Sequence, residues 1–152
     1  MMDWGQAFQI ANSVALVAWI SLIFLPRASW LIFALRRGLV GSICLIYTAV
    51  IFRFISEVDG GGFSTLNEVK ALFGSDAVVF AGWLHYLAFD LFVGLWIAEQ
   101  SDLKKIHRVF QAPILAATFL LGPFGLLLYF ALDSGLAFVR RGVSDQTPTE
   151  SH

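Results

Sequence analysis

The chain has 152 residues, of which 58% are hydrophobic and 14% are charged, and its formal net charge is −1. A soluble domain carries roughly 25% charged residues. This composition, with a mean hydropathy of +0.75, therefore excludes an ordinary soluble protein. Because no basic stripe is present to neutralise phosphates, we expect no nucleic-acid partner.

Four apolar runs are each long enough to cross the roughly 30 Å of hydrocarbon in a bilayer. They predict transmembrane helices at residues 7–25, 38–54, 78–97 and 113–132. Pro123 follows Gly122 in the middle of the fourth run, and because proline removes a backbone hydrogen bond we expect a kink there. We predict an all-α fold, with a four-transmembrane-helix bundle over residues 1–132 and a polar C-terminal tail over residues 133–152.

The connection between the second and third predicted spans contains a turn and a short helix. Residues 60–62 are glycines, which tolerate positive φ and indicate a turn. Thr65 is a candidate N-cap, and Glu68 follows it at the spacing of a capping box. One side of this segment is apolar, which predicts a short amphipathic helix on the membrane surface.

The basic residues predict an orientation. Six of the ten Lys and Arg residues fall in the first and third connections: Arg27, Arg36, Arg37, Lys104, Lys105 and Arg108. Positively charged connections favour the cytoplasmic side. Four spans then place both termini and the Gly-rich connection outside, together with Arg53, Lys70, Arg140 and Arg141.

The third predicted span contains two titratable side chains, His85 and Asp90. An acid in the middle of a membrane helix costs about 2.5–3.5 kcal/mol on insertion scales, so it needs a partner, a cavity or a neutralising proton. Five residues along an α-helix turn the side chains about 140° apart. Asp90 instead shares a face with Tyr86, Trp83 and Gly94. These groups indicate binding, catalysis or proton handling, and helix packing is the alternative.

Other polar residues have two interpretations each. Asn12 in the first span either bonds a neighbouring helix or lines a polar cavity. Arg53 either extends to the headgroups or points into a polar pocket, and Glu68 either caps the short helix or contributes to that pocket. One histidine, one aspartate and the single cysteine, Cys44, are too few for a zinc site. We therefore expect no metal centre.

Two sequence strings carry a resemblance to a known family. GWLHYLAFDLFVG, from Gly82 to Gly94, is followed by TFLLGPFGLLLY, from Thr118 to Tyr129. With these strings, residues 5–132 resemble the abscisic-acid-deficient-four-like family of small four-helix membrane proteins. The resemblance implies a role in carotenoid metabolism, because plant members are required to make the allenic carotenoid neoxanthin from the epoxide violaxanthin. No plastid transit sequence precedes the first span, so we expect a bacterial member in the cytoplasmic membrane.

The resemblance implies a cofactor-free isomerisation. Opening an end-ring epoxide to an allenic alcohol needs an acid at the epoxide oxygen and a base at the adjacent polyene carbon. We expect Asp90 to act as base and His85 as acid, and we expect substrate contacts from Tyr86, Trp83, Asn12, Arg53 and Glu68. The alternatives are a non-catalytic carotenoid-binding or lipid-binding protein, an assembly partner of a membrane enzyme, and a small proton-coupled transporter. A homodimer would help four short helices to enclose a long polyene.

Overall fold

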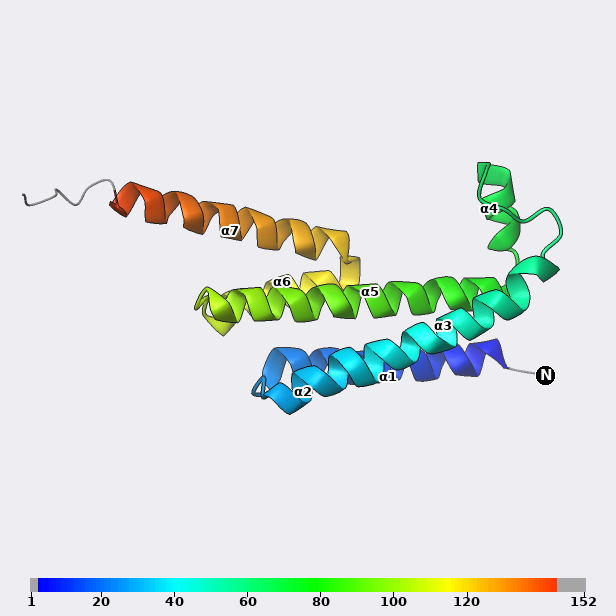
Figure 1. Ribbon diagram of the computed structural model, residues 1–152, viewed down its shortest axis with the longest axis horizontal. Helices are drawn as coiled ribbons and strands as arrows, with labels where there is room; N and C mark the ends of the chain where they lie inside the picture. Colours follow the sequence, from blue (N-terminus) through cyan, green and yellow to red (C-terminus); the bar gives the residue numbers. More distant parts are fainter. Residues whose placement is uncertain (1–2, 145–152) are drawn as a thin grey trace, which may run out of the picture. The chain divides into compact units, whose positions relative to one another are not determined.

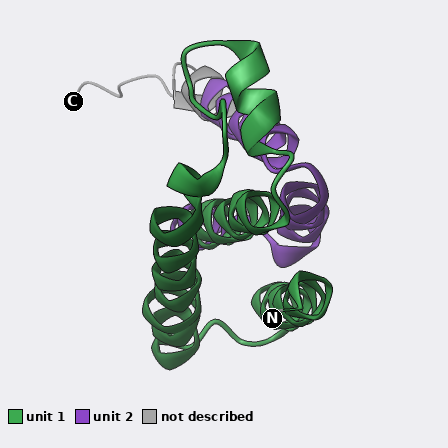
Figure 2. Ribbon diagram, turned by 90° about the vertical axis from the view of Figure 1, so that its right-hand side faces the viewer, with its two compact units in different colours: residues 1–96 green, residues 97–152 purple. Residues whose placement is uncertain are grey.

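The computed structural model describes residues 3–144, with side chains up to residue 138. Every secondary-structure element in these residues is helical. The chain forms two compact units, residues 1–96 and 97–152 (Figure 2). Helix α5, Asp76–Leu103, begins in the first unit and ends in the second. Figure 1 labels the helices and colours the chain along the sequence from the N-terminus.

The first unit begins with α1, Trp4–Phe24, whose N-terminus is capped by Asp3 through a hydrogen bond from the Gln6 amide. The next helical segment is continuous over Ser29–Glu57. It comprises α2 (Ser29–Phe33), a π-helical stretch η1 (Ala34–Val40), α3 (Gly41–Phe54) and a 3₁₀ turn η2 (Ile55–Glu57). The predicted start of the second span at residue 38 is therefore wrong, and Arg36 and Arg37 lie inside this helix.

The predicted turn and the short helix are both confirmed. Gly60 has φ +70°, and α4 covers Leu66–Leu72. The Thr65 hydroxyl accepts a hydrogen bond from the Glu68 amide at 3.3 Å, and the Glu68 carboxylate accepts one from the Ser64 amide at 2.9 Å. Reciprocal bonds of this kind satisfy amides at a helix start that have no partner within the helix.

Helices α1 and α5 pack closely at one point. Trp19 of α1 is 1% exposed, and its ring lies directly over Gly94 of α5, where a Cβ atom would overlap it. Ala15 and Leu22 of α1 and Leu91 of α5 are also buried. The α1–α5 contact is therefore built on a large ring and a residue without a side chain.

The second unit does not confirm the predicted fourth span as one helix. The chain breaks at Gly122, which has φ +23°, into α6 (Arg108–Leu121) and α7 (Pro123–Ser144). The two helices pack against each other, and a Cβ atom at Gly125 would overlap the Thr118 backbone. A single helix at residues 113–132 is therefore not found: the chain makes a helical hairpin where we expected a kink. Because α7 continues past residue 132, its last described turns belong to the predicted polar tail, whose residues 145–152 lie outside the described part.

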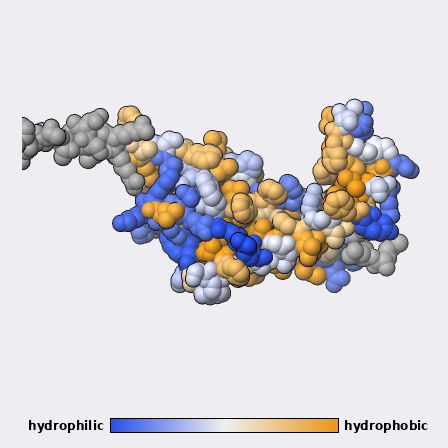
Figure 3. Space-filling view, in the orientation of Figure 1, coloured by the Kyte–Doolittle hydropathy of each residue, from blue (hydrophilic) through white to orange (hydrophobic). Residues whose placement is uncertain are grey.

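Among the residues that the structure describes, three helical segments are long and apolar enough to cross a membrane, namely Trp4–Phe24, Ser29–Glu57 and Asp76–Leu103. Helix α6 is shorter, and so is the stretch of α7 whose side chains are described, Pro123–Phe138. Large apolar side chains such as Leu45, Phe52 and Trp30 are mostly exposed, and apolar residues cover much of the face in Figure 3. Such a surface indicates contact with lipid.

Candidate functional site

Asp90 lies in the middle of α5 and is half-buried. Its Oδ2 atom is buried and accepts no hydrogen bond within the described part of the chain. Tyr86, one helical turn earlier, forms a side-chain hydrogen bond with the Asp90 carboxyl group. Buried polar atoms are nearly always hydrogen-bonded in proteins. An acceptor left open at this depth therefore indicates a place for a proton donor, which a ligand could supply.

Trp83 extends this polar face towards α1. Its indole Nε1 donates a hydrogen bond to Asn12 Oδ1 at 2.7 Å. The Trp83 ring also lies 5.1 Å from the Tyr86 ring and 5.1 Å from the Phe8 ring, measured between centroids. The residues Asn12, Trp83, Tyr86 and Asp90 form what we call the Asp90 cluster. The predicted face of Asp90, Tyr86, Trp83 and Gly94 is thus directed at α1.

His85 lies on another side of α5. Its imidazole stacks on Phe89, with ring centroids 4.4 Å apart, and lies 5.7 Å from the Tyr47 ring of α3. The side chain is exposed. The structure therefore does not bring His85 together with Asp90, in agreement with their five-residue spacing on a regular helix.

Arg53 and Glu68 have local partners. Arg53 is exposed at the end of α3, where it pairs with Glu57 one turn later and lies over the Phe54 ring at 5.1 Å. The Glu68 carboxylate accepts a hydrogen bond from the Ser64 amide, next to the N-cap Thr65, as expected of a capping residue. The exposed position of Arg53 is compatible with headgroup contact, which stays a prediction. The contribution of either residue to a substrate pocket also stays a prediction.

Sequence reasoning missed two aromatic neighbours of these groups. Phe8 contacts Trp83 with its ring tilted, and Tyr47 approaches His85. Phe8 precedes Asn12 by one helical turn. This spacing places both residues on one face of α1, so a contact of Asn12 with Trp83 would have predicted that Phe8 is near Trp83 as well. Tyr47 is brought to His85 by tertiary packing, and no local pattern indicates that contact. Among the described residues, no three His, Cys, Asp or Glu side chains are grouped closely enough to hold a metal ion.

The first unit also contains an apolar groove of about 680 Å³ between α1 and α3. Phe80 and Leu84 of α5 form part of its lining. On α1 the groove is lined by Ala7, Ala11 and Val14, whereas the neighbouring residues Phe8 and Asn12 face Trp83. The groove and the Asp90 cluster therefore lie on different sides of α1.

Comparison with known proteins identifies a family. No curated protein and no solved structure matches the chain. A family model described as ABA DEFICIENT 4-like matches residues 6–129, which include α1, α5, α6 and the start of α7. This match confirms the resemblance carried by the third and fourth apolar runs. The chain belongs to the ABA4-like family, and membership suggests a carotenoid-related membrane protein.

Proposed function

We propose that the protein is a carotenoid isomerase that opens an end-ring epoxide to an allenic alcohol, with Asp90 as the general base. The observation that carries this proposal is the Asp90 carboxyl group in the middle of an apolar helix, with one oxygen buried and without a partner. Family membership supports a carotenoid as the substrate. Intramembrane acids cost free energy and commonly mark functional sites.

The reaction needs two proton transfers and no change of mass. Asp90 takes a proton from the polyene carbon next to the epoxide, and the electron pair of that C–H bond forms the second double bond of the allene. The epoxide C–O bond breaks, and its electron pair remains on oxygen, which then takes a proton to become a hydroxyl group. The product is an isomer of the substrate, so neither oxidant nor reductant is consumed.

The geometry favours Tyr86 over His85 as the proton donor to the epoxide oxygen. The Tyr86 hydroxyl interacts directly with the Asp90 carboxyl group, whereas His85 stacks on Phe89 on another side of the helix. The same hydrogen bond allows Asp90 to return its proton to Tyr86 after each turnover. Trp83, held by Asn12, would form one wall of this site and fix the Tyr86 ring against it.

The test is pigment analysis in a host that makes violaxanthin, with and without the protein. We expect wild type and His85→Gln to produce an allenic isomer of unchanged mass. Asp90→Asn and Tyr86→Phe should lose roughly 10²- to 10⁴-fold in conversion, the usual contribution of general acid–base catalysis. Asp59→Asn and Tyr47→Phe are matched controls outside the cluster. Conversion by Asp90→Asn at the wild-type rate would refute the proposal, and loss of conversion with His85→Gln but not Tyr86→Phe would restore His85 as the acid.

The apolar groove favours a second candidate, a non-catalytic carotenoid-binding protein. Its volume and apolar lining suit part of a long polyene, and no residue of the Asp90 cluster lines it. In that case pigment co-purifies with unchanged chemical structure, and Ala11→Phe, which fills the groove, reduces the bound pigment. Leu16→Phe, at an exposed position of the same helix, is its control. Pigment retained equally by both variants would exclude the groove as the binding place.

A further inference from the structure

A small pocket in the second unit lies at the junction of α5, α6 and α7. It has a volume of about 280 Å³ and is lined by Lys104, Lys105, Ile106, His107, Phe110, Leu132 and Leu136. Two lysines and a histidine lie in the α5–α6 connection, and Phe110 and two leucines come from α6 and α7. The pocket therefore combines a polar, basic lining with an apolar one, and it is separate from the Asp90 cluster.

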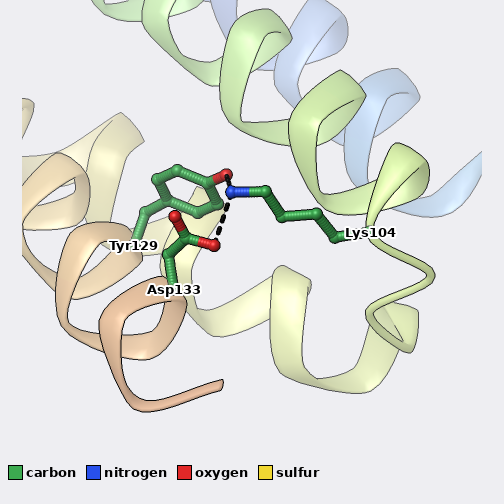
Figure 4. Close-up of polar contacts among 3 residues, drawn as sticks. All are labelled: Lys104, Tyr129 and Asp133. Atoms are coloured by element: carbon green, nitrogen blue, oxygen red, sulfur yellow. Dashed lines mark hydrogen bonds and ion pairs between the residues drawn. The ribbon is translucent and has the colours of Figure 1, made fainter. Parts of the chain in front are cut away.

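Lys104 holds α7 at this junction. Its ammonium group bonds Asp133 Oδ1 at 2.5 Å and the Tyr129 hydroxyl at 3.3 Å (Figure 4). Because Asp133 offsets the charge of Lys104, the attraction of the pocket for an anion falls mainly to its neighbours. The pairing also positions Leu132, which directly precedes Asp133, as part of the apolar lining.

Lys105 and His107 can donate hydrogen bonds to an anionic ligand in this pocket. Lys105 is exposed and has φ +57°, a left-handed backbone conformation that makes the chain turn sharply after α5. His107 Nδ1 accepts a hydrogen bond from the Val109 amide at 3.3 Å. That bond assigns the proton of a neutral imidazole to Nε2, which can donate to an anion.

The position along the chain indicates where this pocket lies in a membrane. The apolar helix α5 ends at Leu103, so Lys104 and Lys105 come directly after a membrane span, at the level of the lipid headgroups. A phospholipid presents a phosphate at that level and acyl chains below it. Inorganic phosphate would match the donors but would leave Phe110, Leu132 and Leu136 without an apolar partner.

We propose that this pocket binds the phosphate of an anionic phospholipid, with Lys105 and His107 as donors and an acyl chain against Phe110, Leu132 and Leu136. The site lies outside the proposed catalytic cluster and does not depend on the proposed reaction. Two nearby acids have partners within the unit: Asp133 binds Lys104, and Asp102 accepts a hydrogen bond from the buried Gln111 side chain at 2.9 Å. Neither acid is part of the pocket lining.

The experiment measures lipid bound to the purified full chain by native mass spectrometry, with equal amounts of phosphatidylglycerol and phosphatidylcholine. We expect wild type to retain phosphatidylglycerol preferentially. Lys105→Asn should retain about fivefold less, the factor expected for one basic residue near an anionic headgroup, and Lys105→Arg should retain the wild-type amount. Asparagine tolerates the positive φ at residue 105. Lys70→Gln removes a charge on α4, which contributes no residue to the pocket lining, and is the control.

Two further measurements make the result decisive. His107→Asn keeps a capping side chain at the start of α6. If this variant binds less phosphatidylglycerol while its circular dichroism spectrum is unchanged, the loss is due to the missing Nε2 donor. Equal retention of the two lipids, or wild-type retention by Lys105→Asn, would overturn the proposal. Displacement of the lipid by inorganic phosphate at low millimolar concentration would also overturn it, because the acyl chain would then contribute nothing.

Discussion

The contact between Lys104 and Asp133 predicts how the chain crosses the membrane. A continuous helix over residues 113–132 would put about 30 Å between its ends, and Asp133 would then lie on the opposite side from Lys104. In the structure, Lys104 Nζ lies 2.5 Å from Asp133 Oδ1. We therefore expect the α6–α7 hairpin to enter and leave the membrane on one side, with the end of α7 on the same side as the α5–α6 connection.

The charges along the chain agree with this topology. With four spans, six of the ten Lys and Arg residues lie towards one side, including Arg36 and Arg37, which the structure places in the first part of the Ser29–Glu57 helix. With three spans and a hairpin, Arg140 and Arg141 would join them, and the number would become eight. Only Arg53 and Lys70 remain on the other side. Because basic residues set orientation, the hairpin strengthens the prediction that the first and third connections are cytoplasmic. It reverses the predicted side of the C-terminal end.

Cysteine labelling in intact cells can decide between the two topologies. Cys44 is the single native cysteine, so Cys44→Ser provides the background for Lys105→Cys, Ser144→Cys and Ser64→Cys. With a membrane-impermeant maleimide we expect residue 64 to react from outside and residues 105 and 144 to react only after lysis. Labelling of residue 144 together with residue 64 would show a fourth span and refute the hairpin.

The same contact has a predictable pH dependence. The hydrogen bond to Asp133 raises the pKa of Lys104 above its ordinary value of 10.5. A raised pKa in the folded state contributes stability below the unfolded-state pKa, and that contribution is lost as pH rises through the folded-state value. Lys104→Gln should therefore lower the thermal midpoint at pH 7 and have a smaller effect at pH 11. Equal effects at the two pH values would show that charge on Lys104 is not involved.

Two further predictions concern the α1–α5 contact. Gly94→Ala should destabilise the detergent-solubilised protein by about 1–3 kcal/mol, the usual cost of overpacking, because the added methyl group meets Trp19. Gly38→Ala, at an open position, is the control and should have little effect. A similar loss of stability in both variants would contradict this account. Trp83→Phe and Asn12→Ala should each remove the same hydrogen bond, with a coupling energy of about 0.6–2 kcal/mol in a double-mutant cycle; purely additive effects would show that the bond contributes nothing.

Local patterns predicted a large part of this structure. The lengths of the apolar runs correctly predicted the positions of helices α1, α3 and α5 to within several residues. The run of glycines correctly predicted the turn at Gly60, and the spacing of Thr65 and Glu68 correctly predicted the cap. Helical spacing also predicted that Asp90 and His85 face different sides. These features depend on neighbours one helical turn apart, which a sequence displays directly.

The failures came where packing decides the outcome. Arg36 and Arg37 indicated a connection, but the helix begins at Ser29 and includes both. Proline after Gly122 is compatible with a kinked helix or a reversal of the chain, and the contact of Gly125 with Thr118 accompanies the reversal that is found. The approach of Tyr47 to His85 likewise joins two helices. Contacts between residues far apart in the sequence leave no local signal.

The most direct test of the central claim is conversion by the purified protein. Wild type and Asp90→Asn, reconstituted in the same lipid, would be incubated with violaxanthin and the pigments separated and weighed by mass spectrometry. We predict an isomer of unchanged mass with an allenic infrared band from wild type, and none from Asp90→Asn. Equal amounts of that isomer from both proteins would contradict the assignment of Asp90 as the base.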